Sequence, residues 1–149
     1  MTKTILILNG PNLNMLGARQ PEIYGSETLD DVASLCAEAA APFGRKIELR
    51  QSNHEGELVD WIHEARDSCD AIVINPGAYS HTSIAILDAL NMFEGPVAEV
   101  HLSNIHAREE FRHSSYVSGR ADAVIVGCGT AGYRFAVQRI CACLSDAVP

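Results

Sequence analysis

The residues with the clearest chemical potential in this 149-residue sequence are a carboxylate and an imidazole in one apolar run, 97–102. Glu99 and His101 are two positions apart on this predicted strand, so their side chains point to the same face. A carboxylate beside an imidazole fixes its tautomer and favours its protonated form, which makes His101 a predicted proton donor. Two ionisable groups on so apolar a strand would be unfavourable without a function. A buried structural ion pair is the alternative.

A second predicted proton handler, Tyr24, belongs to the long loop 9–25. A phenol ionises near pH 10, so it acts as a base at neutral pH only where a cation stabilises the phenolate. Arg19 in the same loop can be that cation. On this pairing alone, ordinary packing of a tyrosine beside an arginine is the favoured interpretation. A loop this long beside a strand end is typical of a lid or binding loop.

These side chains need a scaffold that brings distant segments to one edge. Apolar runs typical of buried strands occur at 4–8, 71–74, 97–102 and 123–126, with a half-exposed edge strand around 47–50. Helical patterns separate them, beginning at Thr28 and after His54, then at 80–90 with Ile84 and Leu87 inward, and at 130–144. This alternation predicts an α/β fold with a parallel sheet. Five strands favour a flavodoxin-like three-layer sandwich of order 2-1-3-4-5.

Ligands of such sheets bind beyond the carboxyl ends of the strands. The polar residues predicted at that edge are Asn9, Asn12, Arg19, Tyr24, Asn75, Ser80, His81, His101, Ser103 and Asn104. Each alone is explained as a satisfied polar group in a loop. As a group, they favour a binding or catalytic site.

Composition excludes several classes of function. The length and the 47% hydrophobic content suit one domain, residues 1–149. A net charge of -8, with only 11 scattered Lys and Arg residues, argues against nucleic acid as a partner. No apolar run is long enough to span a membrane or to form a signal peptide, so we expect a cytoplasmic protein.

Metal and cofactor signals are weak. Cys36, Cys69, Cys128, Cys141 and Cys143 contain no Cys-x-x-Cys pair, so small buried side chains are expected rather than a disulfide framework or a zinc site. The segment 127–132 fits G-x-G-x-x-G, but it follows the last predicted strand, with no further strand to supply a ribose-binding acid. Close packing of helix on sheet explains these glycines better. A bound anion at the helix N-terminus is the alternative.

Ordered motifs along nearly the whole chain carry a specific resemblance. They are Gly-Pro-Asn-Leu-Asn-Met-Leu-Gly at 10–17, Arg-Gln-Pro-Glu-Ile-Tyr-Gly at 19–25, Gln-Ser-Asn at 51–53, Asn-Pro-Gly-Ala-Tyr-Ser-His-Thr-Ser at 75–83, Glu-Val-His-Leu-Ser-Asn-Ile at 99–105, His-Ala-Arg-Glu at 106–109 and Phe-Arg at 111–112. Together they resemble type II 3-dehydroquinate dehydratase. The resemblance implies a flavodoxin-like fold, no metal or cofactor, and a dodecamer of four trimers.

The same resemblance implies removal of water from 3-dehydroquinate to give 3-dehydroshikimate. Tyr24 would be the base that takes the proton alpha to the ketone, with Arg19 favouring its phenolate. An enolate would form, and the beta hydroxyl would leave with a proton from His101, oriented by Glu99. Asn12 would hold a water on the enolate oxygen.

The resemblance also implies the substrate contacts. The backbone N-H groups of Leu102 and Ser103 would bind the carboxylate, and the hydroxyls would contact Asn75, His81 and Arg112, with Arg108 in the same region. Asp88 lies seven residues after His81, about 10 Å further along a helix, too far for the same site. By sequence alone it is a surface acid. The resemblance implies that it approaches the adjoining subunit's site.

Two departures and two rival functions accompany this interpretation. Ala18-Arg19-Gln20 stands where the family commonly has Thr-Arg-Glu, and Arg112-His113-Ser114-Ser115 where a second histidine often precedes the serine. Neither removes a proposed catalytic group. The rivals are a flavin- or nucleotide-binding module and a non-catalytic scaffold. The sequence does not separate shikimate biosynthesis from quinate breakdown, since the chemistry is shared.

Overall fold

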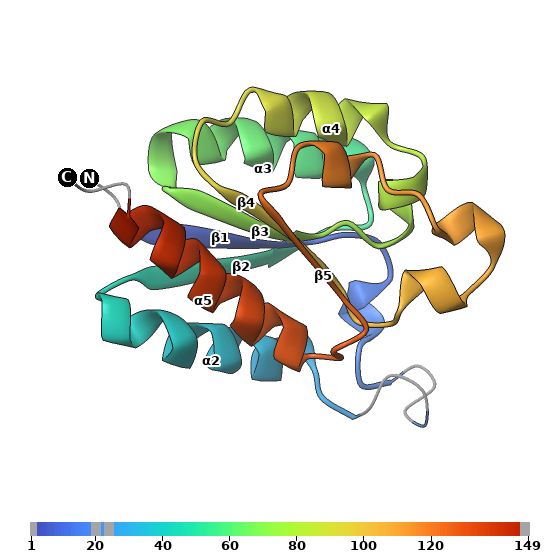
Figure 1. Ribbon diagram of the computed structural model, residues 1–149, viewed down its shortest axis with the longest axis horizontal. Helices are drawn as coiled ribbons and strands as arrows, with labels where there is room; N and C mark the ends of the chain where they lie inside the picture. The colour runs from blue at the N-terminus through green and yellow to red at the C-terminus, as the bar shows by residue number, and fades with distance from the viewer. Residues whose placement is uncertain (1–2, 19–21, 23–25, 147–149) are drawn as a thin grey trace.

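A five-stranded parallel sheet lies at the centre of the protein in the computed structural model, which describes residues 3–18, 22 and 26–146 (Figure 1). Its strands are β1 (Thr4–Asn9), β2 (Lys46–Gln51), β3 (Ala71–Asn75), β4 (Val97–His101) and β5 (Ala123–Val126). Their order is β2-β1-β3-β4-β5, and every neighbouring pair is parallel. The predicted α/β flavodoxin-like sheet of order 2-1-3-4-5 is therefore confirmed.

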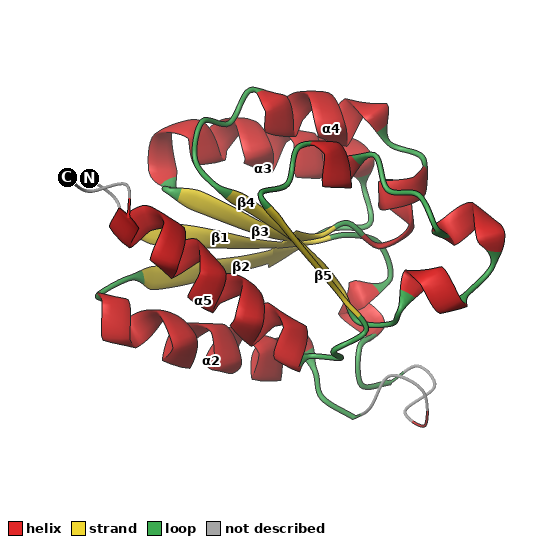
Figure 2. Ribbon diagram, in the orientation of Figure 1, coloured by secondary structure: helices red, strands yellow, loops and turns green. Residues whose placement is uncertain are grey.

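Helices cover both faces of the sheet (Figure 2). On one side are α3 (Glu55–Ser68) and α4 (Ile84–Asn91), and on the other α2 (Leu29–Ala40) and α5 (Ala131–Asp146). Side chains of a strand alternate between faces, so Ile5 and Ile7 pack in the core with α2 and α5 while Leu6 and Leu8 pack with α3 and α4. This double burial explains why β1 is a continuous apolar run.

The start of α2 follows the predicted capping signal. The Thr28 hydroxyl accepts a hydrogen bond from the Asp31 backbone N-H, and the Asp31 carboxylate accepts one from the Thr28 backbone N-H at 2.9 Å. This reciprocal capping box satisfies two N-H groups that the first helical turn leaves without intrahelical partners. The predicted helix start is confirmed.

The predicted helix over 80–90 is wrong in its start and its phase. Residues 77–81 form a short 3-10 helix, η3 (Gly77–His81), and α4 begins only at Ile84. The Ser83 hydroxyl accepts a hydrogen bond from the Ile86 backbone N-H at 2.9 Å and so caps the later start. Ile84, predicted inward, is 55% exposed, and Leu87 is only half-buried. The buried positions of α4 are Ile86, Ala89 and Leu90.

The remaining connections are short 3-10 turns. They are η1 (Leu13–Met15), η2 (Ala41–Phe43), η4 (Ile105–Ala107), η5 (Glu110–Arg112) and η6 (Val117–Gly119). The last three make up the polar segment between β4 and β5, which shows no helical or strand periodicity in the sequence. No helix in the described ranges is long and apolar enough to span a membrane.

The close packing of helix on sheet that was predicted for the glycines before the last helix is found at Gly132. A Cβ at Gly132 would lie 3.3 Å from Val100 and 3.4 Å from Ile125, so close packing of α5 on the sheet explains this glycine.

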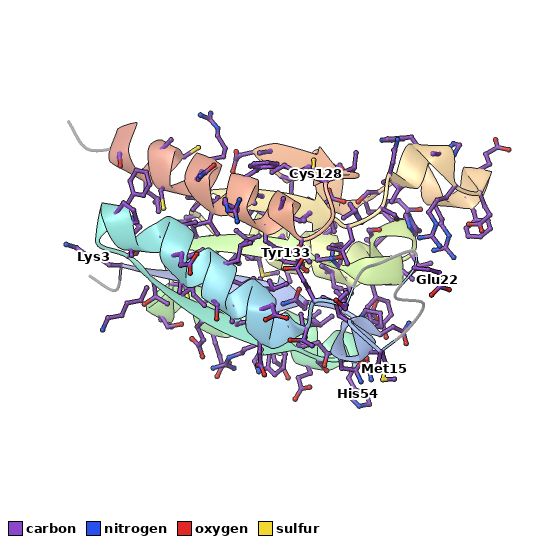
Figure 3. The ribbon with its side chains drawn as sticks, turned by 90° about the horizontal axis from the view of Figure 1, so that it is seen from below. Lys3, Met15, Glu22, His54, Cys128 and Tyr133 are labelled. Atoms are coloured by element: carbon purple, nitrogen blue, oxygen red, sulfur yellow. The ribbon has the colours of Figure 1, made fainter. Side chains whose placement is uncertain are left out.

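The predicted burial of the cysteines is confirmed for Cys36, Cys69 and Cys141, whereas Cys143 is half-buried. For Cys128 it is wrong, because this residue lies on the exposed turn from β5 to α5, between two glycines of positive φ (Figure 3).

Candidate active site

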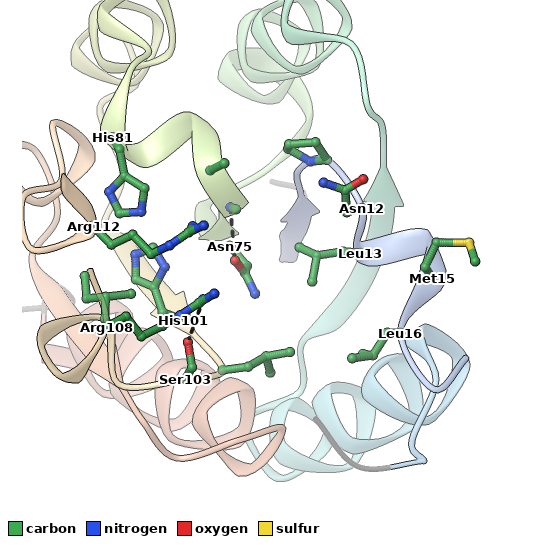
Figure 4. Close-up of a pocket in the computed structure, with 15 residues that line it drawn as sticks. Asn12, Leu13, Met15, Leu16, Asn75, His81, His101, Ser103, Arg108 and Arg112 are labelled. Atoms are coloured by element: carbon green, nitrogen blue, oxygen red, sulfur yellow. Dashed lines mark hydrogen bonds between the residues drawn. The ribbon is translucent and has the colours of Figure 1, made fainter. Parts of the chain in front are cut away.

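One pocket of about 230 Å³ opens where β1, β3 and β4 end (Figure 4). Carboxyl ends of parallel strands meet at one edge of the sheet, and the register places Asn9 beside Asn75 there. The predicted site residues that line the pocket are Asn12, Asn75, His81, His101, Leu102, Ser103, Arg108 and Arg112. The pocket therefore gathers residues as far apart in the sequence as Asn12 and Arg112.

Glu99 and His101 form the buried acid–imidazole pair that the sequence predicts. Glu99 is fully buried, and its Oε2 contacts Nε2 of His101, which lies in the pocket wall with 5% exposure. Ser115 and Ser118 each donate a hydrogen bond of 2.6 Å to the same carboxylate. Because Nε2 is held by Glu99, Nδ1 is the ring nitrogen left to serve a ligand.

Hydrogen bonds keep this buried carboxyl group ionised. Burial by itself would raise the pKa of Glu99, but the bonds from His101, Ser115 and Ser118 outweigh it and hold that pKa below its usual value. A carboxylate with three donors is also a buried polar group with satisfied oxygens. Glu99 can therefore balance a positive charge on the His101 ring.

The depressed pKa of Glu99 predicts a pH-dependent stability. A carboxyl group ionises at about 4.3 in the unfolded chain, so its contribution to folding is present above that pH and is lost as pH falls through the lower folded-state value. We expect the difference in Tm between wild type and Glu99→Gln to shrink below pH 4.3. Calorimetry from pH 7 to pH 3 measures it. A difference that does not change with pH would contradict the assignment.

His81 lies beside His101 on the same side of the pocket (Figure 4). The two rings are stacked, with centroids 6.4 Å apart and planes 17° apart. His81 Nδ1 lies 2.8 Å from the backbone oxygen of Ser114, so this nitrogen donates to the carbonyl. Nε2 of His81 is thereby the acceptor of the neutral ring, suited to a ligand hydroxyl.

Two arginines give the pocket a positive side although the protein as a whole carries -8. Arg108 donates from Nη1 to the Ser103 hydroxyl at 3.3 Å, and Arg112 donates from Nε to Glu109. The Arg112 bond also lowers the pKa of the exposed Glu109 carboxyl. Two guanidinium groups beside the hydroxyl of Ser103 favour a small anionic ligand with several oxygens.

The opposite wall is held by the predicted Gln-Ser-Asn motif. The Asn12 backbone N-H donates to Asn53 Oδ1 at 2.9 Å, and Gln51 Nε2 donates to the Gly10 oxygen at 3.1 Å. Asn12 has φ 70°, a left-handed conformation that asparagine tolerates better than most residues. Residues 51–53 thus fix the start of the loop that carries Asn12. The apolar side chains of this wall, which the sequence analysis did not assign to the site, are Leu13, Met15 and Leu16.

A buried network under the pocket was also missed. The Tyr133 hydroxyl donates to Asn9 Oδ1 at 2.6 Å and accepts from Asn75 Nδ2 at 3.0 Å. Tyr133, labelled on α5 in Figure 3, is fully buried, which raises the pKa of its phenol. Asn75 Oδ1 accepts from the Gly77 N-H at 3.2 Å, so both ends of this amide are oriented. In the sequence, Tyr133 occupies an apolar position of a predicted helix, and nothing in that pattern indicates a polar role for its hydroxyl.

Five residues that the sequence analysis singled out do not line this pocket: Asn9, Ser80, Asp88, Glu99 and Asn104. Asp88 is exposed on α4 and does not line the pocket, as predicted, although His81 lies on η3 and not on the same helix as that prediction assumed. Arg19 and Tyr24 lie outside the described residues. Within the described ranges, no three His, Cys, Asp or Glu side chains gather as metal ligands.

Comparison with known proteins gives one consistent result. The sequence model described as "Dehydroquinase class II" matches residues 3–141. The chain is 72% identical over 139 residues to the 3-dehydroquinate dehydratase of Streptomyces avermitilis, covering 93% of this chain and 87% of the relative. It is 66% identical over 141 residues to the 3-dehydroquinate dehydratase of Cereibacter sphaeroides, covering 95% and 96%.

Solved structures agree. The type II dehydroquinase of Propionibacterium acnes superposes with a TM-score of 0.89 at 48% identity, covering 95% of this chain and 98% of that one. The type II dehydroquinase of Butyrivibrio crossotus gives a TM-score of 0.88 at 44% identity, covering 93% and 97%. Sequence and backbone therefore point to the same group of proteins.

Proposed function

The chain belongs to the class II dehydroquinase family, and on this premise we propose which of its side chains carry out the reaction. The protein is a hydro-lyase that dehydrates 3-dehydroquinate, as its sequence resemblance predicted. Our assignment rests on one observation: the buried Glu99 carboxylate is hydrogen-bonded to His101 in the wall of a pocket that is also lined by Arg108 and Arg112.

We assign the acid step to His101. The beta hydroxyl of the enolate intermediate leaves as water when it receives a proton from the imidazole, and Glu99 balances the charge of the ring before transfer. The orientation of the ring supports this role, because Nε2 is engaged by Glu99 and Nδ1 remains for the leaving oxygen. Glu99 does not line the pocket, so we assign it an orienting and electrostatic role.

We assign the base to Tyr24, with Arg19 favouring the phenolate. The other tyrosines support the choice by their surroundings. Tyr79 donates its hydroxyl to the Asn53 oxygen at 2.8 Å, and burial raises the pKa of Tyr133 further from neutral. Tyr116 is not among the residues that line the pocket. The base then takes the proton alpha to the ketone, and the enolate is neutralised when the hydroxyl departs.

The remaining pocket residues are proposed as substrate contacts. The backbone N-H groups of Leu102 and Ser103 bind the carboxylate, beside Arg108. Asn75, His81 and Arg112 bind the ring hydroxyls, since they supply donors and one acceptor from different walls. Asn12 orients the water that stabilises the enolate oxygen, where a preorganised donor has its largest effect on rate.

A direct assay tests the function. Purified protein, dialysed against a chelator, is mixed with 3-dehydroquinate, and the absorbance of the conjugated enone product is followed. We expect full turnover without added metal, nucleotide or flavin, because acid, base and anion contacts are all side chains or backbone groups. Absence of the enone product, or a rate that depends on added flavin or metal, would overturn the proposal.

Assembly and location are further parts of the proposal. We infer a dodecamer of four trimers in which Asp88 approaches the site of a neighbouring subunit. Large apolar side chains that remain 45% exposed on β5 and α5, Val124 and Phe135, support assembly. We also propose one catalytic domain over residues 1–149 and a cytoplasmic location. The five free cysteines support the location, because thiols stay reduced in the cytosol.

A further inference from the structure

The Glu99 carboxylate also accepts hydrogen bonds from the segment 114–118, to which no function has been assigned. Ser118 donates to Oε1 and Ser115 donates to Oε2, each at 2.6 Å, while His101 contacts Oε2 from the pocket side. Both oxygens are therefore occupied, and contacts this short are typical of hydrogen bonds to an ionised acceptor. Without such donors, an ionised carboxylate that is fully buried from solvent would be strongly destabilised.

The segment 114–118 is fixed at several points. Val117, between the two serines, is fully buried in the core beneath α4. The Tyr116 N-H donates to the Ser80 oxygen at 2.8 Å, and the Ser114 oxygen accepts from His81 at 2.8 Å. The serine hydroxyls are thus held against Glu99 by anchors independent of their own hydrogen bonds.

The surroundings of Glu99 offer little other charge. Its register partners on the neighbouring strands are Ile74 and Val124, and α4 buries apolar side chains on this side of the sheet. The titratable groups facing it are His101 on its own strand and, through the stacked rings, His81. From the segment 114–118 only hydroxyls reach it. Arg120, further along, donates instead to the carbonyls of Leu90, Phe93 and Gly95.

We propose that Ser115 and Ser118 are positioning residues of the acid step, which keep the Glu99 carboxylate ionised and aimed at Nε2 of His101. This inference rests on the proposed function of His101. Removal of the hydroxyls leaves the burial of Glu99 unchanged but takes away two of its three donors. The carboxyl group then takes up a proton at higher pH, and a neutral carboxyl no longer balances a charged imidazole.

The test is a pH profile of kcat and KM for Ser115→Ala, Ser118→Ala and the double variant. We expect kcat to fall several-fold in each single variant and about 10- to 100-fold in the double variant, less than the roughly 10²- to 10⁴-fold that a whole general acid contributes, because His101 itself remains. The acidic limb of the kcat profile moves to higher pH, because more of Glu99 is protonated. KM stays near the wild-type value, since neither serine lines the pocket.

Two controls separate positioning from general damage. Ser68→Ala makes the same side-chain change on α3, where the hydroxyl bonds only within its own helix and to Cys69, and leaves the profile unchanged. Ser115→Thr keeps a hydroxyl and restores most of the wild-type profile. If the alanine variants lower Tm without moving the acidic limb, the serines are merely structural and the inference is overturned.

A second measurement does not depend on turnover. Titration of the Glu99 carboxyl carbon by 13C NMR, in the single variants, is expected to show protonation at higher pH than in wild type. An unchanged titration overturns the inference even where the double variant does not fold. Failure of the proposed function is a different result, since wild type would then give no enone product or His101→Ala would retain full turnover.

Discussion

Replacing His101 with alanine is expected to lower kcat by about 10²- to 10⁴-fold, the usual contribution of a positioned general acid. The alanine side chain has no proton to give the departing hydroxyl, so loss of water from the enolate becomes the slow step. KM should change much less, because the arginines and backbone donors of the pocket remain in place. The appearance of the enone absorbance measures both constants.

The matched control for this variant is His63→Ala, on the exposed face of α3. It should leave turnover unchanged. Addition of imidazole should restore part of the activity of His101→Ala, because imidazole can enter the space left by the ring and, protonated beside the carboxylate of Glu99, donate the proton to the leaving hydroxyl. Wild-type turnover in His101→Ala would refute the assigned acid, and imidazole without effect would argue against the proton donor as the missing part.

Tyr24→Phe is expected to have the second large effect, again about 10²- to 10⁴-fold on kcat. Phenylalanine keeps the ring but removes the oxygen that would take the alpha proton. The first half of the reaction is therefore blocked, and exchange of the alpha proton with solvent deuterium, followed by NMR, should stop together with turnover. In His101→Ala that exchange should continue, because the base is intact.

Tyr116→Phe is the corresponding control, a tyrosine 48% exposed and outside the pocket lining. It should behave like wild type in both assays. Exchange that persists in Tyr24→Phe at the wild-type rate would show that another group removes the proton. The two variants thus separate the base from the acid.

The sheet could be predicted from the sequence because its strands carry their own signal. Buried strands covered on both faces are continuous apolar runs, and the alternation with helices allows few topologies. The Glu99 and His101 contact followed from a period of two residues on a strand. The phase of α4 could not be predicted as easily, since it depends on the Ser83 cap after an irregular turn rather than on apolar spacing alone.

Residues of the site that sequence patterns missed are held by contacts across long chain distances. Tyr133 meets Asn75 and Asn9 over 58 and 124 positions, and Ser118 meets Glu99 from a polar segment of 3-10 turns without periodicity. Their partners depend on the path of loops, which no local pattern encodes. The sequence did not indicate that Leu13 lines the pocket either, because an apolar side chain in a loop usually packs on the core to hold the loop in place.

The hydroxyl of Tyr133 has a consequence for how the protein is made. It joins the ends of β1 and β3 from the first turn of α5, the last helix of the described chain. The ribosome must therefore have synthesised residue 133 before the side-chain amide of Asn75 can form its hydrogen bond beneath the pocket. Nascent chains released before residue 133 would lack this hydrogen bond and the buried face of α5, including Val137 and Ile140, so premature termination should yield a chain with one face of its sheet uncovered rather than a weakly active fragment.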